Sequence, residues 1–271
     1  MQSKNPLVSI IVPTFNSALT ITDTLQSIVT QKYTSIEVLV IDGASADETC
    51  EIVNSFILNY SFIKCISEKD RGVYDAMNKG IQLSKGDFLY FMGSDDVFYA
   101  NDTLDLIFTK ENLSYDIIYG NVEFKKSKKI YSGESSLSKL MESQISICHQ
   151  AIFYSKRTFN IIGNYNLKYF IHADYDFNIR CFKNEELKIK YINIIIAIFN
   201  EAGLSGVNSN ADGFHTELTE FNLSQNYNII GLFEENKKLK NELNNISKSK
   251  EYKLGLFIIS PLKKIKRFLL K

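Results

Sequence analysis

Hydrophobic positions in the first hundred residues follow two alternating patterns. Four segments are continuously apolar, which predicts strands that are covered on both faces, as in a parallel sheet. They are "LVSIIVPTF" (7–15), "IEVLVID" (36–42), "FIKCIS" (62–67) and "DFLYFM" (87–92). The segments between them carry apolar residues at helical spacing. Strands and helices that alternate every roughly 25 to 30 residues predict a doubly wound α/β architecture.

The predicted helices have recognisable faces and ends. Ser45 and Glu48 have the spacing of a capping box, which predicts that the second helix begins near residue 46. The third helix carries its apolar stripe over residues 73–81 and is closed by Gly86. The first helix has its stripe at Ile21, Leu25, Ile28 and Val29.

Polar residues follow each predicted strand at its carboxyl end. They stand in "FN" (15–16), "DG" (42–43), "EKDRG" (68–72) and "GSDD" (93–96). The carboxyl ends of parallel strands meet at one edge of a sheet, and ligands of such sheets bind beyond that edge. The sequence therefore predicts an acidic and polar ligand site there.

Asp95 and Asp96 are the most informative residues of this edge. Two carboxylates at a strand end suit Mg²⁺ or Mn²⁺, which proteins commonly hold with one or two carboxylates plus substrate phosphates. The alternative is an N-capping pair for a helix predicted at about 102–110. No G-x-G-x-x-G follows the first strand and no G-x-x-x-x-G-K-[ST] occurs, which argues against hydride transfer and P-loop chemistry.

Composition narrows the class of protein. Lys plus Arg and Asp plus Glu balance at 31 each in 271 residues, so we expect no nucleic-acid partner. The four cysteines form no C-x-x-C pair, which favours reduced thiols in the cytoplasm. We expect no N-terminal signal and no membrane span, because no apolar run reaches about 18 residues. The longest run, "INIIIAIF" (192–199), predicts a buried strand.

Six motifs, in order, resemble those of family 2 glycosyltransferases with a GT-A fold, a mixed and mostly parallel sheet flanked by helices. They are "VSIIVPTFN", "VLVIDGASADET", "SEKDRGVYDAMNKGI", "GDFLYFMGSDD", "HQAIFY" and "ADYDFNIR". The resemblance covers about residues 7–206 and is nearest to bacterial enzymes that build O-antigen, capsule or exopolysaccharide repeats. It implies a catalytic domain over 1–220, with a nucleotide half at about 7–96 and an acceptor half at about 97–206.

The resemblance also implies roles for residues of the nucleotide half. Thr14 and Asp42 match positions that hold the nucleotide base, and a carboxylate that accepts the ring N–H favours uridine or thymidine. Arg71 and Asn78 lie in the segment that approaches the base and the donor phosphates. Asp95 resembles the ribose-side member of the Asp-x-Asp-type motif of the family.

The remaining implied roles concern the reaction itself. Asp96 resembles the metal-coordinating member of the same motif, and Asp174 in "ADYD" matches the catalytic base. His149 and Gln150 stand where the family often has a pair that faces donor or acceptor. Ala173 replaces the usual Glu before the base. No third metal ligand is assigned, because Asn200 and Glu201 occupy the stretch where the family often has a His.

Several of these residues also have a purely structural interpretation. Asp42 and Asp174 can cap the helices that follow them. Arg71 can be a solvated surface charge, and His149 can be a structural histidine. Four further residues are interpreted as structural: His172, His215, Tyr74 and Met77.

The implied reaction moves a sugar from a nucleotide-diphosphate donor to a hydroxyl of a glycan or a polyprenyl-diphosphate-linked acceptor, with inversion at the anomeric carbon. Mn²⁺ or Mg²⁺ would neutralise the leaving diphosphate, and a carboxylate would take the hydroxyl proton. Two alternatives are a nucleotidyltransferase that acts on sugar phosphates and a non-catalytic GT-A-like module in a membrane-associated assembly. The sequence "NSA" (16–18) lacks the Gly-rich, basic loop that a triphosphate needs.

Residues 221–271 form a tail of different composition. A polar, helix-compatible segment precedes "PLKKIKRFLLK" (261–271), where Leu262, Ile265 and Leu269 share one helical face. A basic amphipathic helix predicts contact with the inner face of the cell membrane, and hence a cytoplasmic, peripheral location. The alternative is docking on the catalytic domain or on a second copy in a homodimer.

Overall fold

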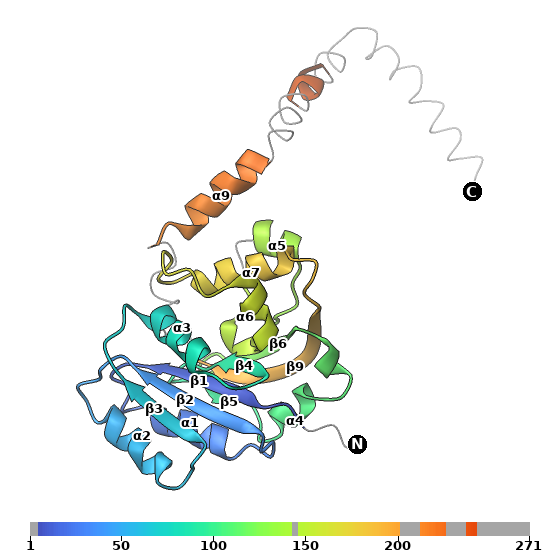
Figure 1. Ribbon diagram of the computed structural model, residues 1–271. Coiled ribbons are helices and arrows are strands. Elements are labelled where there is room, and N and C mark those ends of the chain that lie inside the picture. The colour runs from blue at the N-terminus through green and yellow to red at the C-terminus, as the bar shows by residue number, and fades with distance from the viewer. Residues whose placement is uncertain (1–4, 143–145, 201–211, 226–236, 243–271) are drawn as a thin grey trace. The chain divides into compact units, whose positions relative to one another are not determined.

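A nine-stranded mixed sheet is the centre of the fold (Figure 1). The structure is a computed structural model, and it describes residues 5–142, 146–200, 212–225 and 237–242. The sheet order is β3-β2-β1-β4-β8-β6-β9-β5, and β7 pairs with β6. The strands are β1 (Val8–Thr14), β2 (Ile36–Asp42), β3 (Ile63–Ser67), β4 (Phe88–Phe91), β5 (Val97–Phe98), β6 (Ile117–Phe124), β7 (Ile130–Tyr131), β8 (Ile152–Ser155) and β9 (Ile189–Phe199).

The four strands that the apolar runs predict are β1 to β4, and they pair in parallel. Every residue of β1, β2 and β4 is buried, which is why these segments read as continuous rather than alternating. The other half of the sheet is mixed: β8 runs antiparallel to β4 and β6, whereas β9 runs parallel to β6. The predicted mixed α/β fold is confirmed.

Helices cover both faces of the sheet. Figure 1 shows α1 and α2 on one face and α3, α6 and α7 on the other. The helices are α1 (Ile21–Val29), α2 (Thr49–Ile57), α3 (Val73–Leu83), α4 (Thr103–Ile107), α5 (Leu137–Glu142), α6 (Lys156–Ile162), α7 (Ala173–Lys183) and α9 (Phe214–Gln225), with short 3-10 turns η1 (Asn112–Ser114) and η2 (His149–Ala151). In α1 the predicted apolar face is buried at Ile21, Leu25 and Ile28.

Two predictions about helix starts are wrong. The helix α2 begins at Thr49, and its N-cap Glu48 makes no capping hydrogen bond. The hydroxyl of Ser45 instead donates to Asp42 Oδ1 at 2.5 Å, and its oxygen accepts the backbone N–H of Asn16 at 2.8 Å rather than an N–H of the helix. Asp95 and Asp96 do not cap a helix either, since β5 follows them and the N-cap of α4 is Asp102.

The chain reverses its direction across the sheet at β1. From β1 it adds β2 and β3 on one side and then returns to β4 on the other. The helix α3 connects β3 to β4 and packs closely on β1. The contact is closest at Gly80, where a side chain would collide with Ile11. Such a switch point leaves a crevice beyond the carboxyl ends of the two strands that flank it.

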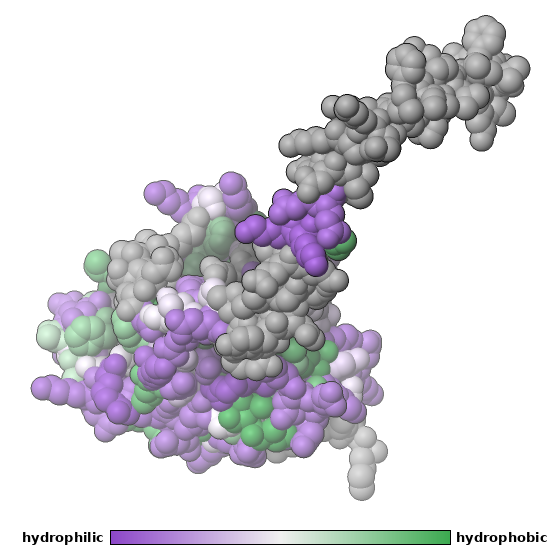
Figure 2. All heavy atoms as spheres, turned by 90° about the horizontal axis from the view of Figure 1, so that it is seen from above, coloured by the Kyte–Doolittle hydropathy of each residue, from purple (hydrophilic) through white to green (hydrophobic). Residues whose placement is uncertain are grey.

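The chain divides into two compact units, Met1–His215 and Thr216–Lys271. The sequence predicts a division at residue 220 into a catalytic domain and a tail, and a division of that domain into two halves. These boundaries stay predictions. On the face that Figure 2 presents, hydrophilic side chains cover most of the described surface and hydrophobic ones form separate patches. No helix within the described ranges is long and apolar enough to cross a membrane. The predicted amphipathic helix at 262–271 lies outside the described residues.

Candidate active site

One cavity of about 520 Å³ lies beyond the carboxyl ends of β1 and β4. Three separate segments bring predicted site residues to its wall: the turn after β4, the turn η2, and the first turn of α7. The predicted residues that line it are Asp95, Asp96, His149, Gln150 and Asp174. The fold therefore gathers both proposed ends of the reaction, the acidic pair and the base, around one space.

Asp96 is held at the acidic end by two amides. Its carboxylate is 1% exposed; Oδ1 accepts the backbone N–H of Asn200 at 2.8 Å, and Oδ2 accepts Nε2 of Gln150 at 2.5 Å. The side chain of Asn200 also donates to Asp95 Oδ2 at 2.7 Å. Within the described part of the chain, each oxygen of Asp96 thus has one donor and keeps a lone pair for a further ligand.

The acidic end carries an excess of negative charge. Burial, followed by the charge of Asp95, raises the pKa of Asp96 to about 6. A bound divalent cation would remove this cost, so the two carboxylates fit Mn²⁺ or Mg²⁺. The described residues contain no group of three or more His, Cys, Asp or Glu side chains suited to a metal. Phosphate oxygens and water would therefore complete the coordination, as is common for Mg²⁺.

Gly93 allows the two carboxylates to lie against the turn. A Cβ at this position would stand 2.5 Å from Asp96 Oδ2 and 3.0 Å from Asp95 Oδ1. A side chain there would push both carboxylates out of place. In the sequence, Gly93 indicates only that a strand ends, and its packing role becomes visible in the structure.

Asp174 lies on the opposite part of the wall, in the first turn of α7. Its side chain is 14% exposed. Oδ1 accepts the backbone N–H of Tyr175 and the hydroxyl of Tyr74, both at 2.8 Å. Oδ2 lies 3.5 Å from Nδ1 of His149. The N-cap of α7 is His172, so the alternative that Asp174 caps this helix is wrong.

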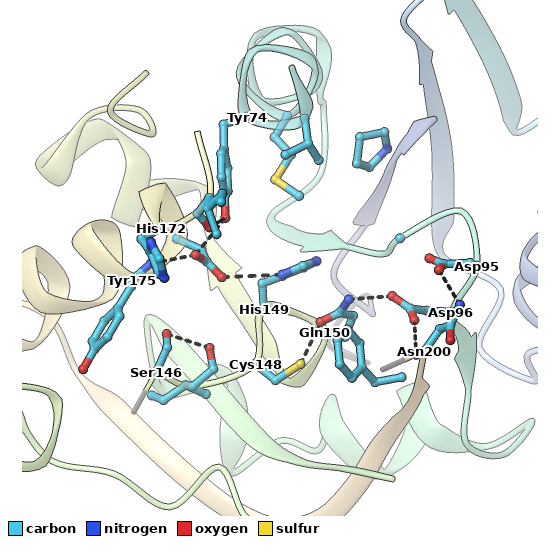
Figure 3. A pocket seen from close by; sticks show the side chains of 18 of the residues that line it. Tyr74, Asp95, Asp96, Ser146, Cys148, His149, Gln150, His172, Tyr175 and Asn200 are labelled. Atoms are coloured by element: carbon cyan, nitrogen blue, oxygen red, sulfur yellow. Dashed lines mark hydrogen bonds and ion pairs between the residues drawn. The ribbon is translucent and has the colours of Figure 1, made fainter. Parts of the chain in front are cut away.

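His149 lies between the two ends. Figure 3 shows its ring between Tyr74 on one side and Gln150 with Asp96 on the other. The ring of His149 lines the cavity and faces Asp174, as the predicted contact with donor or acceptor requires. Gln150 is 2% exposed and occupied by Asp96 and by the thiol of Cys148, so it acts as a support for the acidic end.

Thr14 and Asp42 stand side by side at the carboxyl edge of the sheet, since their strands pair there in register. Asp42 is fully buried and accepts hydrogen bonds from Ser45, Cys50 and Ser67. Burial raises the pKa of Asp42, but the hydrogen bonds from Ser45 and Ser67 outweigh it and leave the pKa below its usual value. Asp42 does not cap α2, so that alternative is wrong.

Arg71 and Asn78, like Thr14 and Asp42, do not line the cavity. The guanidinium of Arg71 is 76% exposed and pairs with Asp75 at 3.0 Å, in keeping with the solvated-charge interpretation. Asn78 is buried, and both ends of its amide bind the backbone of Tyr165 at 3.0 Å. Its observed contacts therefore anchor a loop.

His172 and His215, which are interpreted from the sequence as structural, both line the cavity. Nδ1 of His172 lies 2.8 Å from Asp212, and a carboxylate partner requires this nitrogen to donate. Asp212 also accepts the backbone N–H groups of Ile171, His172 and Phe214. Tyr74 and Met77, predicted as packing residues, line the same cavity. Sequence spacing holds no signal for these contacts, because they join distant segments.

Asp212 is expected to stabilise the wall that carries His172. We expect Asp212→Asn to lower the free energy of unfolding by about 1.5 to 3 kcal/mol, since an amide cannot accept all of these donors. Burial raises the pKa of Asp212, but the hydrogen bonds from His172 and from the backbone lower it by a larger amount. The pKa of Asp212 is therefore below its usual value. Its stabilising effect is therefore present above about pH 4 and is lost as the pH falls below that.

Urea unfolding at pH 7 and at lower pH measures this contribution. Asp105→Asn, the same change at an exposed position of α4, is the control and should change little. Equal loss in the two variants would contradict the role given to Asp212.

The chain is similar to known proteins in sequence and in structure. A family model described as glycosyl transferase family 2 matches residues 9–177. A PGL/p-HBAD biosynthesis glycosyltransferase of Mycobacterium bovis is 42% identical over 201 residues, which cover 73% of this chain and 78% of that protein. The match to the family model spans the acidic turn after β4 and the first turn of α7.

Two solved structures share the fold. S. aureus TarS 1–349 in complex with UDP-GlcNAc superposes with a TM-score of 0.60 at 20% identity, over 73% of this chain and 59% of that one. The mannosyltransferase PcManGT of Pyrobaculum calidifontis, in complex with GDP-Man and Mn²⁺, gives 0.59 at 18% identity, over 76% and 60%. These likenesses confirm the GT-A architecture.

Proposed function

The chain belongs to glycosyl transferase family 2 and is a glycosyltransferase, and from this premise we propose that it inverts the anomeric carbon of the sugar it transfers. The donor is a nucleotide-diphosphate sugar, and the acceptor is a hydroxyl of a glycan or of a lipid-linked glycan. The observation that carries the proposal is the single cavity that Asp95, Asp96 and Asp174 share. Family membership argues against the nucleotidyltransferase and the non-catalytic alternatives.

The acidic end holds the donor diphosphate. Asp96 and Asp95 would hold Mn²⁺ or Mg²⁺, which neutralises the charge of the leaving nucleotide when it is bound. Gln150 and Asn200 keep both carboxylates in place through hydrogen bonds of 2.5 to 2.8 Å. The Mn²⁺ in the PcManGT complex supports a divalent cation in this fold.

Asp174 acts on the acceptor. Its carboxylate takes the proton of the acceptor hydroxyl while that oxygen forms a bond to the anomeric carbon and the bond to the diphosphate breaks. A single direct displacement of this kind inverts the anomeric configuration. General-base assistance of this sort contributes typically about 10²- to 10⁴-fold to a rate.

The base of the donor is assigned to uridine or thymidine through Thr14 and Asp42. The lowered pKa of Asp42 keeps it ionised at neutral pH, as an acceptor for a ring N–H must be. The hydroxyl oxygen of Thr14 is buried and has no hydrogen-bond partner among the described residues, and neither Thr14 nor Asp42 lines the cavity, so this assignment rests on the family resemblance. TarS binds UDP-GlcNAc and PcManGT binds GDP-Man, so the choice of base rests on Asp42 and not on the shared fold.

The acceptor belongs to surface glycan or glycolipid assembly. The 42% identical mycobacterial relative is named for PGL/p-HBAD biosynthesis, which supports this class. We assign the chain to bacterial O-antigen, capsule or exopolysaccharide synthesis on a polyprenyl-diphosphate-linked acceptor.

The stereochemistry of the product tests the mechanism. The protein is incubated with Mn²⁺, an acceptor and UDP- or dTDP-sugars of known anomeric configuration, and the glycoside is examined by NMR. We expect the opposite configuration to that of the donor. Retention would exclude a direct displacement assisted by Asp174, and turnover with GDP-sugars alone would exclude the role given to Asp42.

The tail is assigned to the inner surface of the cell membrane. Its residues 262–271 carry five basic side chains, Lys263, Lys264, Lys266, Arg267 and Lys271. Each basic residue near an anionic surface adds roughly 1 kcal/mol to binding. Deletion of 262–271 is expected to move the protein from the membrane fraction to the soluble fraction of lysed cells. Unchanged fractionation would favour docking on the protein itself or on a second copy.

A further inference from the structure

The two oxygens of Asp174 have different surroundings. Oδ1 accepts two hydrogen bonds of 2.8 Å, from the N–H of Tyr175 and from the hydroxyl of Tyr74. Oδ2 has the Nδ1 of His149 at 3.5 Å and accepts no hydrogen bond from the described part of the chain. A carboxylate oxygen with two donors has no lone pair to spare, whereas one without donors can take a proton. The geometry therefore distinguishes a fixed oxygen from a free one.

Tyr74 is held rigidly enough to fix the first of these oxygens. It is the second residue of α3, its side chain is 6% exposed, and its ring packs against that of Tyr165 with centroids 5.5 Å apart. Burial and the charge of Asp174 raise the pKa of Tyr74 well above its usual value, so its hydroxyl keeps its proton.

The hydroxyl of Tyr74 faces two acceptors with a single hydrogen. It lies 2.7 Å from the carbonyl oxygen of Ile171 and 2.8 Å from Asp174 Oδ1. A hydrogen bond to an ionised carboxylate is roughly twice as strong as one to a neutral carbonyl. The hydrogen therefore points to Asp174 while that carboxylate is charged, and the Ile171 carbonyl competes for it once Asp174 is protonated.

We propose that Tyr74 is a positioning residue for the reaction: it holds Oδ1 of Asp174 so that Oδ2 faces the acceptor, and it stabilises the ionised carboxylate. The inference rests on the proposed role of Asp174 as the base. The proton of the acceptor hydroxyl passes to Oδ2, the acceptor oxygen bonds to the anomeric carbon, and the diphosphate leaves with the electron pair of the broken bond.

Other titratable groups surround Asp174, and the test has to separate them from Tyr74. They are Cys148 and His149 at η2, Tyr154 on β8, Tyr165 before α7, and His172 at the N-cap of α7. Among the described residues, only Tyr74 donates a side-chain hydrogen bond to the carboxylate. The others are unchanged in a Tyr74 variant, so their contributions cancel when it is compared with the unaltered protein.

The experiment compares Tyr74→Phe with Tyr165→Phe in the full chain. Both changes remove one phenolic hydroxyl from the same aromatic cluster, but the hydroxyl of Tyr165 has no hydrogen-bond partner among the described residues. We expect Tyr74→Phe to lower kcat by about tenfold with little change in the KM of the donor. We also expect the acidic limb of the pH profile of kcat/KM to move to higher pH, because the carboxylate loses a hydrogen-bond donor. Tyr165→Phe should do neither.

Equal kcat values and equal pH profiles in the two variants would overturn the inference. A double variant of Tyr74→Phe with Asp174→Asn gives a second measurement. If Tyr74 acts through Asp174, removal of its hydroxyl has no further effect on the residual rate of Asp174→Asn. A further tenfold loss in the double variant would overturn the inference as well. Full activity of Asp174→Asn alone would overturn the role of the base, whereas an inactive Asp174→Asn beside an unaffected Tyr74→Phe would overturn only the positioning role.

Discussion

Asp174→Asn is expected to lower kcat by about 10²- to 10⁴-fold while donor binding stays within about twofold. The amide has almost the same shape as the carboxylate and can still accept the hydrogen bonds of Tyr74 and Tyr175 through its oxygen. It cannot take a proton from the acceptor hydroxyl. The loss should therefore fall on the chemical step and leave the site at Asp96 unchanged.

Initial rates with saturating donor measure the effect on kcat, and calorimetric titration with the nucleotide measures binding. Asp176→Asn is the matched control: it lies on the same helix two residues away and pairs with Arg180 at 2.9 Å, outside the cavity. We expect this control to keep its rate. A variant Asp174→Asn with full activity would require another base, and His172 with its partner Asp212 would be the first residue to test.

Asp96→Asn is expected to lower kcat/KM by at least about 10²-fold, through loss of the divalent cation and of the charge neutralisation that it provides. Asp96 is 1% exposed and lies in the same turn as Asp95. Binding of the cation therefore depends on the charge of Asp96, because few other groups are placed to replace it. We further expect that Mn²⁺ together with UDP raises the melting temperature of the unaltered protein and no longer raises that of the variant.

Thermal unfolding with and without Mn²⁺ and UDP separates this effect from a folding defect. Asp102→Asn makes the same change at the N-cap of α4, where the carboxylate is 43% exposed, and should keep the metal-dependent rise. An equal rise in Asp96→Asn and in the unaltered protein would mean that the cation binds elsewhere or is not required.

The two variants test different ends of one cavity. A variant that loses the Mn²⁺-dependent rise in melting temperature has lost the function proposed for Asp96. A variant that loses turnover but still binds the nucleotide has lost the function proposed for Asp174. Failure of both predictions would leave the family membership in place and remove the mechanism proposed for this chain.

Local patterns determine a large part of the fold. The apolar runs at 7–15, 36–42 and 87–92 predict β1, β2 and β4 to within two residues at each end. A strand that is buried on both faces is mostly apolar along its length, and its buried polar residues are paired, as Ser9 is with Glu37, so its position is visible without any knowledge of its neighbours. The same logic places Asp95 and Asp96 at a carboxyl edge, because the change from apolar to acidic residues happens where the strand ends.

Helix starts are less well determined by local patterns. Ser45 has the spacing of a capping residue, yet its hydroxyl serves the buried carboxylate of Asp42 instead. A cap would use the hydroxyl oxygen of Ser45 as an acceptor for a helix N–H. That oxygen instead accepts the backbone N–H of Asn16, while its hydrogen goes to Asp42, which the packing of β2 and β3 buries.

The sequence by itself determined the α/β architecture and the acidic turn, because each depends on residues that are close in the chain. The candidate base Asp174 came from the resemblance of motifs and stays a prediction. Only the tertiary structure decided which distant groups hold them. Tyr74 meets Asp174 across 100 positions, Gln150 meets Asp96 across 54, and His172 meets Asp212 across 40. The periodicity of strands and helices is a property of a few neighbouring residues, whereas these partners meet only when the connections between strands fold back over the edge of the sheet.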